Sequence, residues 1–516
     1  MKRDDARARI FEGDGTAWDV AVIGGGATGI GVAVDAASRG YSVCLVEQSD
    51  FGKGTSSRST KLVHGGVRYL QQGNVSLVME ALRERGRLRQ NAPHLVRDLA
   101  FVVPNYDWWE TPFYGIGMKV YDKLAGKYGF GRSRVLSREE TLGRIPTLAT
   151  EGLRGGVLYY DGQFDDARLL VSLARTATAH GAALMNYVRC VGLNKDDDGF
   201  VDGLDVEDLA TGRRARVPAR CVVNATGAFS DAVRRLDDPA AEAMIAPSQG
   251  VHVVLDGRFL GGESAIMVPR TSDGRVLFAI PWHGMTVVGT TDTSIETPEL
   301  EPRALPEEIA FILETAADYL SEPPARTDVR SVFVGIRPLV KAPGASSTAA
   351  LSRDHTIHIS PSGLLTIAGG KWTTYRNMAE DCVDHAITLG RLDEHACVTK
   401  ELAVVGATDT SHDGPLAVYG SDADAIAALD ATPIHPRLPI TAGQVDWAVA
   451  HEMAQTVDDV LARRTRALLL DARAAAEAAP AVARRIAEAL GHDRAWADAQ
   501  TKAFVGLAAQ YQLGPE

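Results

Sequence analysis

The stretch DVAVIGGGATGIGVAVDAASRGYSVCLVE, residues 19–47, decides the fold class of this protein. A short apolar run at 19–23 is followed by three glycines, by an Ala- and Val-rich segment that Gly40 ends, and by a second apolar run ending in Glu47. This order predicts a strand, a glycine turn, a helix and a second strand. Because the crossover in such a unit is right-handed, we expect the two strands to be parallel neighbours in one buried sheet.

The glycine turn has the spacing Gly24-x-Gly26-x-x-Gly29. Gly24 permits the tight turn, Gly26 lets the backbone approach a pyrophosphate, and Gly29 lets the helix lie close to the strand. The N terminus of the helix offers unpaired N–H groups and positive potential to phosphates. Glu47, at the end of the next strand, can accept hydrogen bonds from a ribose hydroxyl. The segment therefore predicts a bound dinucleotide.

Two further glycine-marked segments lie far downstream of this unit. The run CVVNATG at 221–227 indicates a buried strand ending in small residues, which lets the backbone pass close beneath a cofactor on the first unit. The run GGKWTTYR at 369–376 places two glycines before a helix, whose N terminus directs positive potential at a flat ring. A reduced flavin is negatively charged, so this placement, reinforced by Lys371, favours reduction. Three separated segments indicate a tightly held flavin rather than an exchangeable nicotinamide.

Size and composition narrow the class of protein. A chain of 516 residues is too long for one hydrophobic core, so two or three packed units are expected. The net charge of −12 argues against nucleic acid as a partner, because a phosphate backbone requires clustered Lys and Arg. The five cysteines are scattered without a CxxC pair, so we expect neither a disulfide scaffold nor a metal site. No apolar run approaches the ~18 residues of a membrane span, and the first sixteen residues lack the apolar segment of a secretory signal.

Several elements are expected beyond the glycine segments. A helix is expected at 75–91, and the aromatic residues that follow it are expected to pack between subdomains: Trp108, Trp109, Phe113, Tyr114 and Tyr121. Beyond residue 398 the Ala-rich composition predicts a separate helical domain. Within that domain, apolar residues at 445, 449, 453, 457 and 461 predict one helical face. Arg463, Arg464 and Arg466 are expected on a solvated, ion-paired face.

Several segments together resemble the FAD-dependent glycerol-3-phosphate dehydrogenase family. The matching runs are TSSRSTKLVHGGVRYL at 55–70, NATG at 224–227, GIRP at 335–338, SRDH at 352–355 and GGKWTTYR at 369–376. YYDGQFDDAR at 159–168 and the segment at 107–126 resemble the aerobic, mitochondrial-type branch, and VDDVLARRTRALLLDAR at 457–473 resembles the helical cap of the family. The resemblance runs from residue 19 nearly to the end of the chain. The calcium-binding extension of that branch is not expected, because no EF-hand loop pattern occurs.

The resemblance implies an α/β fold with three kinds of domain. These are a Rossmann-like FAD-binding domain of the glutathione-reductase and D-amino-acid-oxidase type, an antiparallel-sheet substrate domain and an all-helical C-terminal domain. The ranges expected are 17–105, 201–240 and 336–395 for the FAD-binding domain, 106–200 for a substrate or cap region with return strands, 241–335 for the substrate-binding β-sheet domain and 396–516 for the helical domain.

The resemblance also implies roles for individual residues. His64 and Arg337 are expected as the acid–base pair at the substrate hydroxyl, with His252 as a further candidate for the base. The residues expected to bind the substrate are Arg68, Tyr69, His252, Arg353 and Lys371. The residues expected to bind the cofactor are Gly24, Gly26, Ala27, Thr28, Gly29, Glu47, Gln48, Thr55, Ser56, Ser57, Lys61, Leu62, His64, Gly65, Ala225, Thr226, Gly227, Gly370, Lys371, Trp372 and Thr373. Arginine suits a phosphate because its fork donates two parallel hydrogen bonds, and histidine takes up a proton near neutral pH.

The activity that the resemblance implies is oxidation of sn-glycerol 3-phosphate to dihydroxyacetone phosphate in glycerol and glycerophospholipid catabolism. Hydride passes to flavin N5 and electrons pass on to a quinone. We therefore expect a cytoplasmic protein attached peripherally to the inner face of the plasma membrane, and a homodimer remains open. An oxidase using dioxygen and an amine oxidase are alternatives on related folds. A flavin-binding regulatory or RNA-modifying protein is an alternative from another class, which the acidic charge disfavours.

Overall fold

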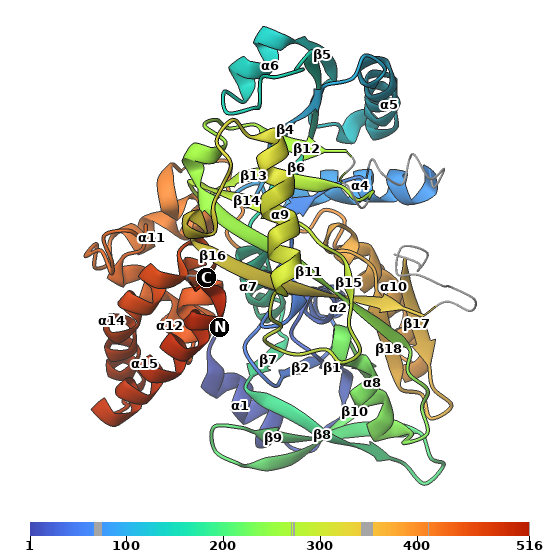
Figure 1. Cartoon of the computed structure of the whole chain (residues 1–516). Coiled ribbons are helices and arrows are strands. Elements are labelled where there is room, and N and C mark those ends of the chain that lie inside the picture. The colour runs from blue at the N-terminus through green and yellow to red at the C-terminus, as the bar shows by residue number, and fades with distance from the viewer. Residues whose placement is uncertain (67–74, 270, 272–273, 342–353, 411, 515–516) are drawn as a thin grey trace.

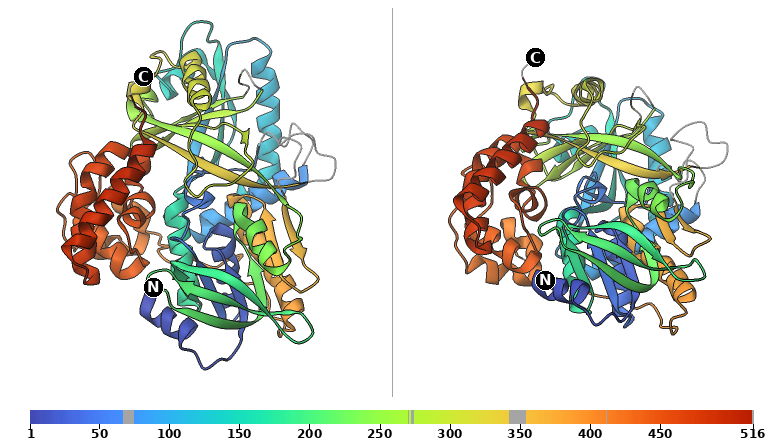
Figure 2. Two further views of the ribbon diagram at one scale, coloured as in Figure 1. Left: turned by 60° about the horizontal axis from the view of Figure 1, so that its bottom comes forward. Right: turned by 90° about the horizontal axis from the view of Figure 1, so that it is seen from below.

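A computed structural model of the chain describes residues 1–66, 75–269, 271, 274–341, 354–410 and 412–514. Two large β-sheets and a group of C-terminal helices packed beside them make up the molecule (Figures 1 and 2). Among the described helices, none is long and apolar enough to cross a lipid bilayer.

The first sheet is built around the predicted strand–turn–helix–strand unit. Its main strands, in spatial order, are β17 (His355–Ile359), β18 (Leu365–Gly369), β10 (Arg214–Asn224), β1 (Trp18–Ile23), β2 (Val43–Glu47) and β7 (Ala183–Asn186). Strands β18 to β7 run parallel in that order, and β17 is antiparallel to β18. The central strands β1 and β2 are runs of Val, Ala, Ile and Leu, as a parallel sheet buried on both faces requires.

Helices and a small antiparallel extension complete this part of the molecule. The helices are α1 (Arg3–Phe11), α2 (Ala27–Ser38), α7 (Asp166–Ala179), α8 (Ser230–Asp237) and α10 (Tyr375–Gly390). Helix α2 directly follows β1 and packs against α7 and α10. The first half of β10 pairs with β9 (Val201–Asp208), which pairs in turn with β8 (Val188–Lys195), seen at the bottom of Figure 1.

The second sheet is mixed, whereas an antiparallel sheet is expected from the sequence. Its strands, in spatial order, are β15 (Thr293–Ser294), β11 (Ile245–Asp256), β14 (Met285–Gly289), β13 (Leu277–Trp282), β12 (Ala265–Val268), β4 (Val96–Asn105), β6 (Gly155–Phe164) and β3 (Leu62–Val63). In addition, β16 (Ser331–Val340) pairs with β11 and β5 (Arg134–Ser137) pairs with β6. The exception to antiparallel pairing is β4 beside β12, because a long connection brings β12 back alongside β4 in the same direction.

Both faces of the second sheet are covered. The helices of this part are α4 (Val75–Asn91), α5 (Glu110–Ala125), α6 (Arg138–Arg144) and α9 (Pro306–Tyr319), and α4 confirms the helix predicted at 75–91. On one face Ile312 of α9 joins Val253 of β11 in an apolar cluster. On the other face Phe333 of β16 clusters with Leu468 of the C-terminal helices. The sheet therefore lies between α9 and the C-terminal helices (Figure 1).

The C-terminal region is helical, as predicted, but its apolar face is not continuous. Its helices are α11 (Ala423–Ala427), α12 (Ala442–Glu452), α13 (Ala467–Leu470), α14 (Ala472–Leu490) and α15 (Arg494–Ala508). The single helical face predicted for residues 445–461 is wrong, because α12 ends at Glu452 and Met453 adopts a left-handed conformation with φ of 55°. The carboxylate of Asp459 then accepts the N–H groups of Gln455 and Thr456 at 2.7 and 3.1 Å, which starts a separate π-helical turn over 459–464.

The aromatic stretch around α5 divides into inner and outer side chains. Tyr114 and Tyr121 are buried, in agreement with the packing expected for them. Trp108, Trp109 and Phe113 are exposed, so the prediction that they pack between subdomains is wrong. Which of these aromatic side chains neighbouring elements cover depends on the tertiary fold, which the local sequence does not specify.

The strands cross the predicted domain ranges at two places. Strand β4 lies at the end of 17–105, a range expected to belong to the FAD-binding domain, yet it pairs along its whole length with β6 in the second sheet. Strand β7 lies within 106–200, yet it pairs with β2 in the first sheet. The chain therefore passes from one sheet to the other inside these ranges. The local sequence does not show this, because β6 and β2, the pairing partners of β4 and β7, are distant along the chain.

Candidate active site

The first cavity lies where the parallel strands of the first sheet end. The carboxyl ends of β1, β2, β10 and β18 reach it through Ile23, Glu47, Ala225 and Gly369. Doubly wound sheets bind ligands at this edge. The cavity has a volume of about 430 Å³, which is within the range of cofactor sites.

Close backbone contacts require the glycines of the predicted motif. A Cβ atom on Gly29 would lie 1.9 Å from the carbonyl oxygen of Gly24. A Cβ atom on Gly24, which has φ of +112°, would lie 2.7 Å from the carbonyl oxygen of Ala225. The N–H of Ala27, at the start of α2, donates to Ser56 Oγ at 2.9 Å. The turn therefore brings the N terminus of α2 to the cavity, where it attracts phosphate.

The three glycine-marked segments meet at this cavity. The indole Nε1 of Trp372 donates to the carbonyl oxygen of Ser56 at 2.8 Å, and Ser56 Oγ accepts the N–H of Ala27, so Ser56 connects the third segment to the first. Gly369 and Gly370 both adopt left-handed conformations, with φ of +78° and +73°. The predicted cofactor residues that line the cavity are Gly24, Gly26, Ala27, Thr28, Glu47, Gln48, Thr55, Ser56, Ala225, Thr226, Gly227, Gly370, Lys371 and Trp372.

The donor set of the cavity fits a flavin adenine dinucleotide. Glu47 accepts the N–H groups of Gly25 and Ser49 at 2.7 and 2.8 Å, which orients its carboxylate for a ribose hydroxyl, and burial raises the pKa of Glu47.

Apolar side chains that sequence reasoning missed also line the cavity: Val188 and Cys190 of β8 and Val233 and Leu236 of α8. Residues of these types are common in any strand or helix, so no sequence motif identifies them as part of the cavity.

A second, smaller cavity lies against the second sheet. Its volume is about 230 Å³. The polar and charged residues that line it are Thr60, His64, Asp161, Arg275, Thr290, Thr291, Asp292 and Arg337. Its apolar wall consists of Leu62, Phe101, Tyr159, Met267, Pro269, Val276 and Phe278. Two cationic guanidinium groups beside a hydrophobic wall suit a small phosphorylated substrate.

The two cavities adjoin along β16. Arg337 lines the second cavity, and the next residue, Pro338, lines the first. A second connection passes through His64, which lines the second cavity and whose N–H donates to Thr373 Oγ1 at 3.3 Å. Trp372, the residue before Thr373, lines the first cavity. The structure thus brings the predicted pair His64 and Arg337 to one cavity, beside the site that fits the cofactor.

Arg337 is held by acceptors on β11 and in the loop between β14 and β15. Its Nη1 donates to the carbonyl oxygen of Gln249 and to Asp292 Oδ1, both at 3.2 Å. Its Nη2 donates to the carbonyl oxygen of Thr291 at 2.8 Å. A Cβ atom on Gly250 would lie 2.5 Å from Nη2, so this glycine makes room for the guanidinium on the neighbouring strand β11. The orientation of Arg337 is therefore set by the sheet rather than by the substrate.

A buried pair behind the second cavity was not predicted from the sequence. Asp161 of β6 lines the cavity and accepts Nη1 of Arg85 at 2.6 Å, and both side chains are buried. The hydroxyl of Tyr121, on α5, donates to the other oxygen of Asp161 at 2.8 Å. The N–H of Gly65 in turn donates to the Tyr121 hydroxyl at 2.9 Å. This chain of contacts fixes the backbone next to His64.

Two predicted cofactor residues lie behind the cavities instead of lining them. The Nζ of Lys61 is buried and donates to both oxygens of Asp166 at 2.8 and 2.9 Å and to the carbonyl oxygen of Ser57 at 2.7 Å. Burial lowers the pKa of Lys61, which Asp166 opposes. Ser57 Oγ donates to the carbonyl oxygen of Gly52 at 2.8 Å. The ammonium of Lys61, which was predicted to bind the cofactor, therefore pairs with a carboxylate in the core.

His252, predicted as a substrate contact, lines neither of the two cavities. Its ring stacks on Phe333 at a centroid distance of 4.7 Å, and its Nε2 lies 2.9 Å from Thr60 Oγ1, which does line the second cavity. Burial and the charges of Lys61 and Arg337 lower the pKa of His252 well below its usual value. A neutral His252 therefore positions Thr60 from behind.

The remaining predicted residues differ in where the structure places them. Arg68, Tyr69 and Arg353 lie outside the described residues. Lys371, predicted to bind the substrate, lines the first cavity and not the second. Leu62 lines the second cavity, and besides Ser57 and Lys61 the predicted cofactor residues that line neither cavity are Gly29, Gly65 and Thr373.

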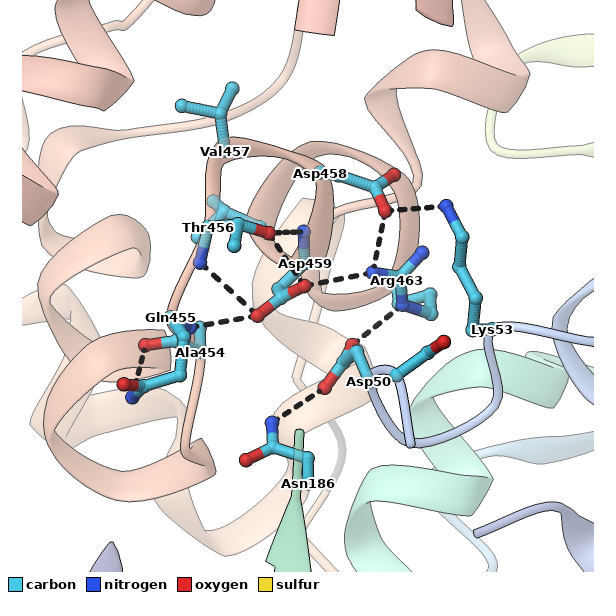
Figure 3. A network of polar contacts seen from close by, with 12 residues as sticks. Asp50, Lys53, Asn186, Ala454, Gln455, Thr456, Val457, Asp458, Asp459 and Arg463 are labelled. Carbon is cyan, nitrogen blue, oxygen red and sulfur yellow. Dashed lines mark hydrogen bonds and ion pairs between the residues drawn. The ribbon is translucent and has the colours of Figure 1, made fainter. Parts of the chain in front are cut away.

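The arginines of the C-terminal segment are buried, so the solvated face predicted for them is wrong. Arg463, Arg464 and Arg466 are 2%, 0% and 4% exposed. Arg464 forms a bidentate pair with Asp50 at 2.7 and 2.9 Å. Figure 3 shows how Arg463 bridges Asp50, at 2.6 Å, to Asp458, at 2.9 Å. Asp50 lies in the loop after β2, more than 400 residues earlier in the chain, where local spacing gives no sign of it.

This buried network reaches the first cavity. Lys53 lines the cavity and donates to Asp458 at 2.7 Å (Figure 3). Burial alone would raise the pKa of Asp50, but Arg464 and Arg463 lower it to about 2, so its carboxylate is charged at neutral pH. The C-terminal helices are therefore joined by ion pairs to the loop that lines the cofactor cavity.

The fold and the adjoining cavities define an FAD-dependent oxidoreductase. Residues 19–376 match the family model described as FAD dependent oxidoreductase, and residues 364–497 match the C-terminal domain of alpha-glycerophosphate oxidase. Within this class, the chain belongs to the FAD-dependent glycerol-3-phosphate dehydrogenase family. This confirms the predicted family, fold class and cofactor.

Individual relatives are similar over nearly the whole chain. A probable mitochondrial glycerol-3-phosphate dehydrogenase of Caenorhabditis elegans is 42% identical over an alignment of 539 residues, gaps included. The alignment covers 97% of this chain and 74% of the relative. The mitochondrial enzyme of Homo sapiens is 42% identical over 523 residues, which cover 93% and 71%. The glycerol-3-phosphate dehydrogenase from Bacillus halodurans, solved in complex with FAD, superposes with a TM-score of 0.80 at 30% identity and covers 100% of this chain and 99% of that one.

Proposed function

We propose that this protein oxidises sn-glycerol 3-phosphate at C2 to dihydroxyacetone phosphate. The observation that carries the proposal is the junction of the two cavities along β16, where Arg337 lines the smaller cavity and Pro338 the cofactor cavity. The names of relatives with 42% identity support the same substrate. FAD, when bound, supplies the acceptor for the hydride at its N5 atom.

The residues of the second cavity divide the remaining chemistry. Arg337 keeps its proton at any physiological pH, so it cannot act as the base. Its guanidinium instead donates hydrogen bonds to the C2 oxygen, where negative charge grows as the hydroxyl proton leaves. His64 is the base that accepts this proton, since His252 lies outside the cavity.

The substrate phosphate requires further cations. Arg275 lines the same cavity as Arg337 and is assigned here to the phosphate, for which a guanidinium fork is suited. Arg68, Tyr69 and Arg353 remain candidates through the family resemblance alone. Lys371 remains a candidate from the side of the cofactor cavity, whose lining includes it.

We further propose a membrane quinone as the electron acceptor. Family resemblance supports this acceptor, together with a cytoplasmic location, peripheral contact with the inner face of the plasma membrane, and a homodimer as the assembly. The second candidate function is a glycerol-3-phosphate oxidase using dioxygen, which the description of the C-terminal match favours. The dehydrogenase ranks first because the relatives at 42% identity are named as dehydrogenases.

Anaerobic mixing of the FAD-loaded protein with sn-glycerol 3-phosphate tests the substrate. The flavin absorbance is expected to bleach with this compound and not with glycine or D-alanine, and failure to bleach overturns the proposal. Reoxidation of the bleached protein then tests the acceptor. Fast reoxidation by a quinone analogue and slow reoxidation by air support the dehydrogenase. Fast reoxidation by air with release of hydrogen peroxide identifies an oxidase instead.

A further inference from the structure

A carboxylate that lines neither cavity is buried behind Arg337. Glu308 lies in the first turn of α9 and is 4% exposed. Helix α9 covers the face of the second sheet that lies opposite the C-terminal helices (Figure 1). A buried carboxylate requires hydrogen-bond donors at its oxygens, so its partners show which segments it holds together.

Four donors converge on Glu308. Gln249 Nε2 donates to its Oε2 at 2.7 Å, and the N–H of Leu305 donates to the same oxygen at 2.9 Å. The hydroxyls of Thr291 and Thr293 donate to its Oε1 at 3.0 and 2.6 Å. A carboxylate accepts at both oxygens, whereas an amide in its place would turn an NH2 group towards two of these donors. The site therefore requires a carboxylate at this position.

Two of the donors belong to the residues that hold Arg337. Arg337 Nη1 donates to the carbonyl oxygen of Gln249, and its Nη2 donates to the carbonyl oxygen of Thr291. The Thr291 hydroxyl also accepts the N–H of Val251 at 3.0 Å, which joins its loop to β11. Glu308 therefore binds the side chains of the same two residues whose carbonyl oxygens orient the guanidinium.

The sheet separates Glu308 from the second cavity. Successive side chains of a strand point to opposite faces. On β11, Gln249 contacts Glu308, and Val251 belongs to the apolar cluster of α9. On β16, Arg337 is four residues after Phe333, which belongs to the cluster on the other face. Glu308 thus acts through the backbone of the strands and loop between it and the cavity, and not on the substrate.

We propose that Glu308 is a positioning residue for Arg337. It holds the loop at 290–293 against β11, so that two carbonyl oxygens direct the guanidinium into the second cavity. The effect on catalysis rests on the proposed function, whereas the control of the Arg337 position does not. Because Arg337 is assigned to charge that develops on the C2 oxygen, its displacement lowers the rate of flavin reduction more than the affinity for the substrate.

A double-mutant cycle on the FAD-loaded protein, followed by anaerobic stopped flow with sn-glycerol 3-phosphate, tests this role. We expect Glu308→Gln to retain FAD and to lower the limiting rate of flavin reduction ~10-fold or more, with the substrate dissociation constant changed less than ~3-fold. In the Arg337→Ala background the same change is expected to have no further effect, because the residue through which it acts is absent. The matched control, Glu314→Gln at an exposed position of the same helix, is expected to be reduced at the unaltered rate.

Thr293→Val is a second variant, which removes one donor to Glu308 and leaves the carboxylate in place. It is expected to slow flavin reduction ~3-fold or more, again only while Arg337 is present, and it decides the test if Glu308→Gln does not fold. A crystal structure of FAD-loaded Glu308→Gln without substrate, or of Thr293→Val in its place, measures the position directly. We expect Arg337 Nη2 to lie beyond hydrogen-bond distance of the Thr291 carbonyl oxygen.

Reduction of both variants at the unaltered rate would overturn the proposal, and so would an equal loss of rate in the Arg337→Ala background. Arg337 at an unchanged position in the crystal structure would also overturn it. If sn-glycerol 3-phosphate does not reduce the unaltered protein, the proposed substrate is wrong, and the crystal structure still decides whether Glu308 positions Arg337. The two proposals therefore fail separately.

Discussion

Replacement of Asp50 by asparagine removes the carboxylate that two buried arginines share. Arg464 binds both carboxylate oxygens at 2.7 and 2.9 Å, and Arg463 binds one at 2.6 Å, with all three side chains at most 3% exposed. A buried charge that loses its partner costs ~3–5 kcal/mol. Arg463 retains Asp458, whereas the nearest remaining contact of Arg464 is the carbonyl oxygen of Glu452 at 2.8 Å. We therefore expect Asp50→Asn to lower the free energy of unfolding by ~3–5 kcal/mol.

Urea unfolding, followed by circular dichroism, measures this loss against a matched exposed pair. Glu322→Gln removes a carboxylate that binds Arg258 at 2.6 and 2.7 Å on the surface, where the expected cost is at most ~1 kcal/mol. Because the pKa of Asp50 is lowered from 3.8 to about 2 in the folded chain, its contribution is present above pH 3.8 and is lost as the pH falls towards 2. If Asp50→Asn destabilises the protein no more than Glu322→Gln does at neutral pH, the buried ion pair does not have the stabilising role assigned to it.

Two further predictions concern the glycine turn and a buried histidine. Gly29→Ala places a Cβ atom 1.9 Å from the Gly24 carbonyl oxygen, so we expect at least tenfold less flavin per protein after gel filtration. The control, Gly506→Ala, lies in an open position of α15. It is expected to retain FAD and to unfold at the same or a slightly higher urea concentration. Normal retention by Gly29→Ala would show that the turn can move. Burial lowers the pKa of His94 from 6.5 to about 4, so the folded chain resists its protonation and loses stability as the pH falls from 6.5 to 4. His94→Leu is expected to flatten that fall in urea unfolding, and an unchanged slope would contradict the assignment.

The cofactor site could be predicted because its signals are local. The spacing from Gly24 to Gly29 and the acid at Glu47 follow from the geometry of one strand, turn and helix, which occupy 29 consecutive residues. The other two segments carry their own glycines before the turn into a helix. Residues such as Val188 and Leu236 have no such signal, because any apolar residue packed at that place would serve.

The errors share a physical cause, which is that burial depends on partners distant in the chain. Arg463 and Arg464 were expected in solvent because near acids suggested surface pairs, yet their main partner is Asp50. Lys61 was expected at the flavin by its place in a family motif, but Asp166 holds it in the core. Phe113 is the converse case, since it was expected to pack between subdomains but no neighbouring element covers it.

The rate of anaerobic flavin reduction by sn-glycerol 3-phosphate, measured by stopped flow, tests the central role of Arg337 most directly. Arg330→Ala is the matched control, because Arg330 precedes the same strand, pairs with Asp256 and lines neither cavity. We predict that Arg337→Ala retains FAD and is reduced ~10²–10³-fold more slowly, as expected when a donor to a developing oxyanion is removed, while Arg330→Ala is reduced at the unaltered rate. Reduction of Arg337→Ala at the unaltered rate would contradict the assignment of the second cavity as the site of reaction.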